Sequence, residues 1–214
     1  MKLMRSTKSL ALSLPRRLRI ALGVPARGND TFSSFRTYLP GVLQWLDPAD
    51  ALEFGPGLSS SLILENSDAR LLSFQTGPSP PERARPATMH ERIDLRLCPG
   101  PTDFSELAGR AFDVVFVDGG DRVANLLGSR PLLREAGITV LHDAHRESYL
   151  PGVRAYDHGY FIENHSLLLF KSRSRFHELR ALFPPDDQCQ CHYCGTPERI
   201  QYRKRVAAEL AESD

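Results

Sequence analysis

The sequence predicts an α/β fold: a mostly parallel sheet of seven strands, with an antiparallel last strand and helices on both faces. Three observations support this prediction. Strand-like and helix-like segments alternate along the chain. A glycine turn follows an apolar run in ALEFGPGLSSSLIL, residues 51–64, as it does where a strand leads into a helix beside a ligand. The segment FDVVFVDGG, residues 112–120, is a continuous β-branched and aromatic run, typical of a parallel strand covered on both faces.

Local patterns give the order of the elements. Residues 31–46 place apolar side chains at helical spacing, and we expect Pro40-Gly41 to bend or split this helix. Further helices are expected after the glycine turn, as a short helix at 104–110, as a broken helix at 123–137, and as a polar helix at 197–213. The expected strands are residues 51–54, 70–75, 92–98, 112–120 and 138–144, followed by two strands that form a hairpin within 159–173.

Length and composition are those of an ordinary soluble globular protein. The chain has 214 residues, of which 41% are hydrophobic and 25% are charged, so one domain with a full core and some extensions is expected. The net charge of +1 produces no field that would attract nucleic acid, and we expect no nucleic-acid partner. No apolar run reaches the roughly 18 residues of a membrane span, and no clean signal peptide is present, so a cytoplasmic location is expected.

We expect three regions along the chain: a basic arm at 1–30, an α/β domain at 31–175, and a C-terminal extension at 176–214. Residues 1–29 contain seven basic residues and no acidic one. Two interpretations of this arm stay open. It is either a solvated segment or a basic amphipathic helix that makes peripheral contact with an anionic membrane surface or a partner.

Polar residues gather where the expected strands end. In open α/β sheets, ligands bind beyond the carboxyl ends of the strands. At these ends the chain concentrates acidic residues, glycines and one histidine, so the sequence predicts a site there. The residues are Glu53 to Gly57, Gln75, Cys98, Asp118 to Asp121, His142 and Asp143.

Three of these segments resemble motifs of class I S-adenosylmethionine-dependent methyltransferases. LEFGPGLSS is similar to the family's first motif, FDVVFVDGG to its strand-four motif, and LLREAGITVLHD to its strand-five segment of helix, glycine turn and strand. VDGGDR with VLHD is most similar to a bacterial subgroup with Asp-Gly-x-Asp after strand four and His-Asp after strand five. The resemblance implies a Rossmann-like fold, S-adenosyl-L-methionine as cofactor, and a transferase activity of EC class 2.1.1. We expect O-methylation of a small molecule or sugar.

The resemblance also implies which residues bind the cofactor. Gly55 and Gly57 would let bare backbone approach its amino-acid tail and ribose, and the amides at the serine-rich helix start would accept its carboxylate. Gln75 stands where the family has an acid that holds the ribose hydroxyls, and an amide binds these less strongly than a carboxylate does. The full implied set is Glu53, Phe54, Gly55, Pro56, Gly57, Ser59, Ser60, Gln75, Asp118 and Gly119. A plain tight turn with serine helix caps is the structural alternative.

His142, Asp118 and Asp143 are the candidate catalytic residues. His142 is the preferred general base, because a histidine takes up and releases protons near neutral pH. Asp143 is expected to act with it, to orient His142 or Arg146, or to cap a helix. Some relatives hold a divalent cation between these strand ends, but Ala144 stands where they carry Asn, so no such cation is expected at Asp118 and Asp143.

Three of the four cysteines lie in CQCHYC, residues 189–194. Cys189, Cys191 and Cys194 with His192 offer ligands that suit zinc, although the usual Cys-x-x-Cys pairs are missing. Zinc binding, free thiols, and a redox or disulfide role all stay open.

Two other function classes compete with a methyltransferase. Gln75 and the lack of an acceptor motif favour a non-catalytic, methyltransferase-like binding module. A dinucleotide-dependent dehydrogenase is less favoured, because its Gly-x-Gly-x-x-Gly motif is incomplete here.

Overall fold

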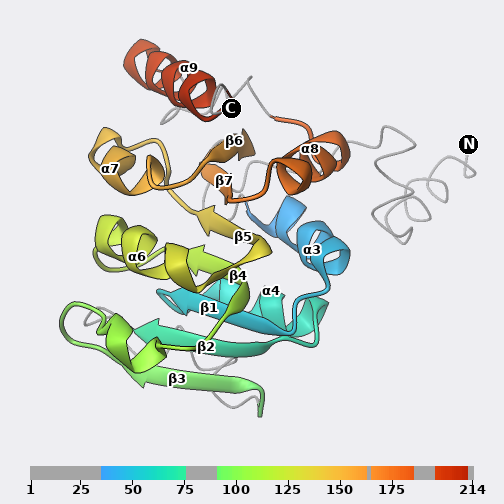
Figure 1. Ribbon diagram of the computed structural model, residues 1–214, viewed down its shortest axis with the longest axis vertical. Coiled ribbons are helices and arrows are strands. Elements are labelled where there is room, and N and C mark those ends of the chain that lie inside the picture. The colour runs from blue at the N-terminus through green and yellow to red at the C-terminus, as the bar shows by residue number, and fades with distance from the viewer. Residues whose placement is uncertain (1–34, 76–90, 163–164, 186–195, 212–214) are drawn as a thin grey trace, which may run out of the picture. The chain divides into compact units, whose positions relative to one another are not determined.

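The computed structural model describes residues 35–75, 91–162, 165–185 and 196–211, and the basic arm predicted at 1–30 lies outside them. They form a seven-stranded sheet in the order β3-β2-β1-β4-β5-β7-β6 (Figure 1). The strands are β1 (Asp50–Phe54), β2 (Arg70–Gln75), β3 (Ile93–Leu97), β4 (Phe112–Val117), β5 (Leu133–Leu141), β6 (His158–Ile162) and β7 (Ser166–Phe170). β7 runs antiparallel to both of its neighbours, and all other pairs are parallel. The predicted α/β sheet with an antiparallel last strand is confirmed.

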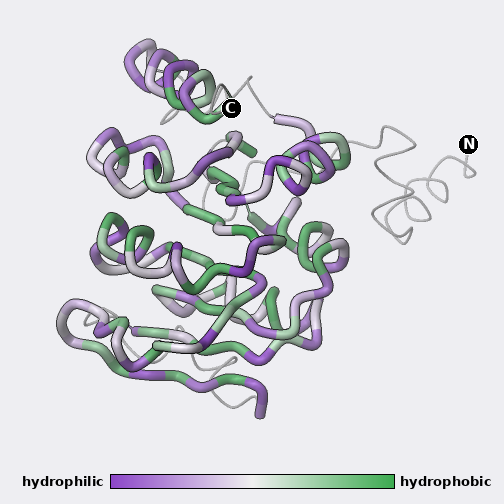
Figure 2. Tube along the Cα trace, in the orientation of Figure 1, coloured by the Kyte–Doolittle hydropathy of each residue, from purple (hydrophilic) through white to green (hydrophobic). Residues whose placement is uncertain are grey.

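Helices cover both faces of this sheet. On one face lie α3 (Phe35–Leu46), α4 (Leu58–Asn66) and α8 (Arg173–Leu182), and on the other α6 (Arg122–Ser129), α7 (Leu150–Val153) and α9 (Pro197–Ala211). Every residue of β1 is buried, because its alternating side chains enter the two cores in turn. Figure 2 shows that α9 is largely hydrophilic, yet Tyr202, Val206 and Leu210 pack into the core. Among the described helices, none combines the length and the apolarity that crossing a bilayer requires.

The helix predicted at 31–46 is present over Phe35–Leu46, and Pro40 lies inside it without splitting it. Of the two effects expected of Pro40-Gly41, a bend or a split, the split is therefore wrong. Helix α8 was not foreseen. It begins after Ser172, whose hydroxyl accepts a hydrogen bond from the backbone N–H of Arg175 at 3.5 Å, and it buries Phe176 and Leu179.

The broken helix predicted at 123–137 is also corrected. Helix α6 ends at Ser129, and after a 3-10 turn the chain enters β5 at Leu133, well before the predicted start at 138. Non-local contacts account for this, since Arg134 bonds Asp113 at 2.5 Å and Asp50 at 3.1 Å. β5 ends at Leu141, so the segment resembling a helix, a turn and a strand is mostly strand, and His142 follows it directly.

Two smaller expectations also change. The helix expected at 104–110 is only a 3-10 turn at Phe104–Leu107, which is capped by Asp103. The C-terminal helix is present over Pro197–Ala211 and packs against β6.

Candidate functional site

Three loops meet at the carboxyl edge of the central strands. The backbone N–H of Gly55 after β1 donates to the Phe74 carbonyl at 3.0 Å, and that of Asp118 after β4 donates to the Phe54 carbonyl at 2.9 Å. The N–H of His142 after β5 donates to the Val117 carbonyl at 3.0 Å. These bonds continue the sheet ladder into the loops. They fix the loops against one another at the edge where α/β sheets bind ligands.

Glu53, the last-but-one residue of β1, is fully buried and accepts three hydrogen bonds from serines. Ser59 and Ser60, in the first turn of α4, each donate at 2.6 Å, and Ser73 of β2 donates at the same distance. The Ser60 hydroxyl in turn accepts the backbone N–H of Gly57 at 3.0 Å. The hydroxyls of these serines therefore hold the loop and do not face outward.

Burial raises the pKa of Glu53 to about 7, against the three serine hydrogen bonds that favour its carboxylate form. The negative charge of Asp118 raises it slightly further. A carboxylic acid with this pKa exchanges its proton near neutral pH, so the loop can respond to a positive charge that binds beside it.

The two glycines of the first loop differ in kind. Gly55 has a φ of +94°, and a Cβ there would lie 2.8 Å from the backbone nitrogen of Gly119. It is therefore required by the fold itself, because the first loop packs directly on the loop after β4. Gly57 has an extended φ of −176°, and a Cβ there would meet nothing within 4 Å. The open space in front of Gly57 is available to a ligand.

Asp118 and His142 are brought together, as the sequence predicted from neighbouring strand ends. The Nδ1 atom of His142 lies 2.9 Å from the Asp118 carboxylate, and the His142 side chain is 13% exposed. Arg122 donates to the same carboxylate at 3.0 Å and to the Asp118 carbonyl at 2.9 Å. With Nδ1 bonded to a carboxylate, the neutral ring keeps its lone pair on Nε2, the arrangement of a histidine base.

Arg122 lies in the candidate site, although the sequence analysis did not single it out. Its side chain is 14% exposed, and its guanidinium lies over the Tyr149 ring, 5.4 Å from the centroid. The sequence did contain a signal for this contact: Arg122 stands four residues after Asp118, at the start of a helix, and side chains at this spacing lie on the same face.

Asp143 does not cap a helix, so this alternative is wrong: the next turn, a 3-10 turn, begins only at Glu147. Its backbone adopts a left-handed φ of 56°, which is rare for a residue other than glycine. Its carboxylate lies 3.8 Å from His142, 3.8 Å from Arg122 and 3.7 Å from Arg146. The contacts with the two arginines are ion pairs without direct hydrogen bonds, so Asp143 adds negative potential to the site.

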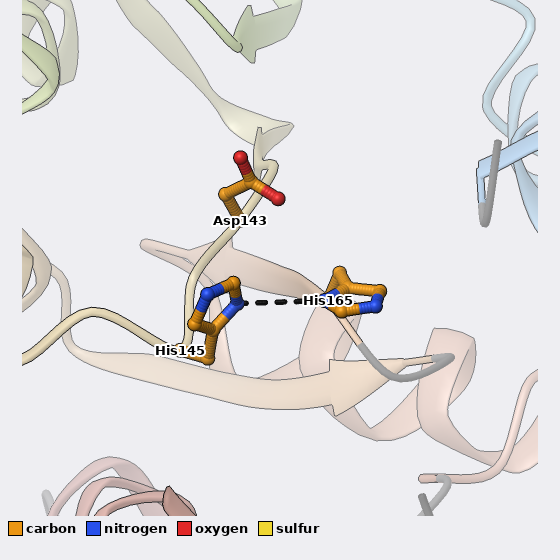
Figure 3. Close-up of side chains that lie close together, drawn as sticks. All are labelled: Asp143, His145 and His165. Carbon is orange, nitrogen blue, oxygen red and sulfur yellow. Dashed lines mark hydrogen bonds between the residues drawn. The ribbon is translucent and has the colours of Figure 1, made fainter. Parts of the chain in front are cut away.

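A histidine pair that the sequence analysis missed lies beside Asp143 (Figure 3). The Nδ1 atoms of His145 and His165 are 3.4 Å apart, and their ligating atoms and that of Asp143 all lie within 4.8 Å of one another. Burial lowers the pKa of His145 to about 4, and it also lowers the pKa of His165. The charge of Arg199 acts in the same direction on His145. The negative charge of Asp143 opposes this lowering of the pKa in both rings, and the geometry is that of two rings sharing a hydrogen bond.

The remaining predicted residues occupy different positions. Phe54 is a core residue whose ring stacks on Phe74, with centroids 5.8 Å apart. Gln75 ends β2, next to the end of β1, and its carbonyl accepts the Cys98 N–H at 2.9 Å. Gly119 is held by Asn125, whose amide donates to its carbonyl at 3.0 Å. The proposed zinc ligands Cys189, Cys191, His192 and Cys194 lie outside the described residues.

The sequence matches no protein-family model, and it has no significant match among curated proteins. Solved structures are similar in fold. A methyltransferase from Geobacter sulfurreducens aligns at 16% identity with a TM-score of 0.50, over 78% of this chain and 94% of that one. The cofactor-bound Rv0187 from MTB aligns at 19% identity with a TM-score of 0.51, over 80% and 94%.

The O-methyltransferase TomG from Streptomyces achromogenes, involved in tomaymycin synthesis and solved with SAM, aligns at 17% identity with a TM-score of 0.50, over 78% and 90%. Likeness at these identities concerns the fold. The chain has the Rossmann-like fold of these methyltransferases, as the sequence predicted.

Proposed function

We propose that this protein is an S-adenosylmethionine-dependent methyltransferase that methylates an oxygen of a small molecule or sugar. The observation that carries the proposal is the loop after β1, in which buried Glu53 holds Ser59 and Ser60 while Gly57 faces open space. It lies beside the Asp118–His142 pair, which suits the deprotonation of a hydroxyl.

The residues of the first loop fit the methyl donor. The open space at Gly57 would admit its amino-acid tail, and a positive ammonium group beside the loop would favour the carboxylate form of Glu53. Gln75, at the end of the neighbouring strand, would bind the ribose hydroxyls. When bound, S-adenosylmethionine supplies a methyl group on a positively charged sulfur.

The second part of the proposal concerns the proton of the acceptor hydroxyl. His142 would accept this proton at Nε2, and the Asp118 carboxylate would hold the ring by its Nδ1–H and stabilise the imidazolium that forms. Arg122 fixes Asp118 through two hydrogen bonds, to its carboxylate and to its carbonyl, so it acts as a positioning residue.

Calorimetric titration with S-adenosylhomocysteine tests the donor part. We expect micromolar binding to the natural protein, weaker binding to Gly57→Ala, and none to Gly57→Val, because the added methyl groups fill the space in front of the loop. Ala49→Val is the control, since it also introduces a valine, at an exposed position just before β1, at the opposite edge of the sheet. Unchanged binding in Gly57→Val, or no binding to the natural protein, would refute the donor site.

Turnover tests the acceptor part. Transfer of a labelled methyl group would be followed over a panel of phenols, sugars and hydroxy acids. His142→Asn is expected to keep S-adenosylhomocysteine binding while it lowers turnover by about 10²–10⁴-fold, the usual contribution of a general base. Donor binding without turnover on any acceptor would instead support a binding module.

A further inference from the structure

A basic cavity lies at the free edge of the sheet, away from the site described above. It has a volume of about 250 Å³ and is bounded by β6, α8 and α9. β6 is the last strand in the sheet order, and in Figure 1 it lies between α8 and α9. An edge strand leaves the N–H and C=O groups on its outer side without a strand partner, so the backbone there offers acceptors as well as donors.

The charges around the cavity are all of one sign. Arg180 of α8 and Arg203 and Lys204 of α9 line it, and none of the described residues that line it is acidic. Arg180 and Lys204 are exposed, whereas Arg203 is only 7% exposed. Two exposed cations and one buried cation therefore line the cavity.

Arg203 is the anomalous residue. Its Nη1 atom is buried without a hydrogen-bond partner, and no described residue forms an ion pair with it. The next arginine along α9, Arg205, pairs with Glu147. A buried guanidinium carries a large desolvation cost unless an opposite charge or several acceptors offset it. The cavity beside Arg203 is where such acceptors would have to come from.

A second unsatisfied donor belongs to a residue that lines the same cavity. The Tyr160 side chain is 2% exposed, its ring stacks on Phe170 with centroids 6.0 Å apart, and its hydroxyl is buried without a partner. Arg203 and Tyr160 come from different elements, yet both line one cavity, and each has an unused donor buried behind the cavity wall. Two such groups at one place indicate a missing acceptor with more than one oxygen.

We propose that this cavity binds a phosphoryl group, as free phosphate or as part of a small phosphorylated molecule. A guanidinium fork matches phosphate oxygens, lysine adds a point charge, and the tyrosine hydroxyl adds a donor. Three cations are balanced better by a dianion than by a single carboxylate. The volume equals that of roughly eight water molecules, so it exceeds what one phosphate needs and leaves room for a small substituent. The proposal does not rest on the methyltransferase function.

Calorimetry with the full chain tests it, using inorganic phosphate, glycerol 3-phosphate and acetate in chloride buffer of constant ionic strength. We expect both phosphate probes to bind and acetate not to. Tighter binding of glycerol 3-phosphate would identify a phosphorylated molecule as the ligand, and equal binding would identify free phosphate. Arg203→Met is expected to weaken phosphate binding at least tenfold, and Tyr160→Phe severalfold. Arg205→Met, which removes the same charge from the same helix, should change it less than twofold.

Thermal unfolding of these variants distinguishes two explanations for the buried charge of Arg203: neutralisation by a bound ligand, or by an acidic side chain of the same chain. Without phosphate, Arg203→Met should raise the unfolding temperature, because it removes a buried unpaired charge, and added phosphate should stabilise only the natural protein. The proposal is overturned if Arg203→Met and the double variant Asp186→Asn/Asp187→Asn both lower the unfolding temperature. That result would mean that carboxylates of the chain itself neutralise the charge of Arg203. Equal loss of phosphate binding in Arg203→Met and Arg205→Met would also overturn it, as would no binding. If Arg203→Met fails to fold, Arg180→Gln with Tyr160→Phe gives the same comparison.

Discussion

The hydroxyl of Ser60 donates to the carboxylate of Glu53 at 2.6 Å and accepts the backbone N–H of Gly57 at 3.0 Å. A single side chain therefore connects a buried acid in the sheet to the turn that faces the proposed ligand. This connection sets the shape of the loop, and several measurable consequences follow from it.

Ser60→Ala should destabilise the protein by about 1–3 kcal/mol, because it leaves the Gly57 N–H without its acceptor and removes a donor from buried Glu53. It should also weaken S-adenosylhomocysteine binding, since the turn loses its anchor. Chemical denaturation and calorimetry measure the two effects. Ser61→Ala is the control, because no hydrogen bond of the Ser61 side chain is seen in the described structure, and a loss equal to that of Ser60→Ala would contradict the argument.

The stability of the protein should depend on pH through Glu53. Its folded pKa of about 7 is above the value of 4.5 in an unfolded chain, so the folded state holds the proton more tightly. This stabilisation is complete below pH 4.5 and is lost as the pH rises through about 7, a change of about 3 kcal/mol.

The variant Glu53→Gln isolates this effect, because glutamine cannot ionise. Urea denaturation of both proteins from pH 4 to 8 should show the natural protein losing stability relative to the variant as the pH rises. A relative gain with rising pH would mean that the three serines keep Glu53 ionised.

Gly55→Ala and Gly57→Ala should differ in their effect on the stability of the protein. At Gly55, the positive φ and the 2.8 Å approach to Gly119 make any side chain costly, and we expect a loss of about 2–3 kcal/mol or failure to fold. Gly57→Ala should leave stability within about 1 kcal/mol, since its backbone is extended and its surroundings are open. Thermal unfolding distinguishes the two, and similar losses at both positions would contradict the open space at Gly57.

Gln75→Glu should tighten S-adenosylhomocysteine binding, by up to about tenfold, because charge-assisted hydrogen bonds to ribose hydroxyls are roughly twice as strong as neutral ones. Gln75→Ala should weaken it. Calorimetry on the natural protein and the two variants measures this order. Equal affinity of all three proteins for S-adenosylhomocysteine would exclude Gln75 from the proposed donor site.

His145 should remain neutral throughout the range in which most histidines titrate. Burial holds its pKa at about 4, so its imidazole C–H signals in NMR spectra should stay constant from pH 8 to 5 and move only below. Because the folded pKa is lowered, the contribution of His145 to stability is present above pH 6.5 and is lost as the pH falls toward 4. Titration of His145 near pH 6.5 would show that its ring is not buried against His165 as the structure has it.

The sequence by itself determined the sheet and the edge that carries the site. Continuous apolar runs such as 112–117 bury both faces of a strand, and glycines and acids directly after them mark the carboxyl ends. Those are local signals, and from them the sequence predicted Glu53, Gly57, Asp118 and His142 as site residues. Only the tertiary structure decided what these residues do to one another: that the Ser59 and Ser60 hydroxyls face Glu53, and that β5 begins at Leu133 because Arg134 meets Asp50 and Asp113. It also brought His145 to His165 and left Arg203 buried beside a cavity. Such contacts join residues distant in sequence, and their energies depend on burial and geometry, which a local pattern does not contain.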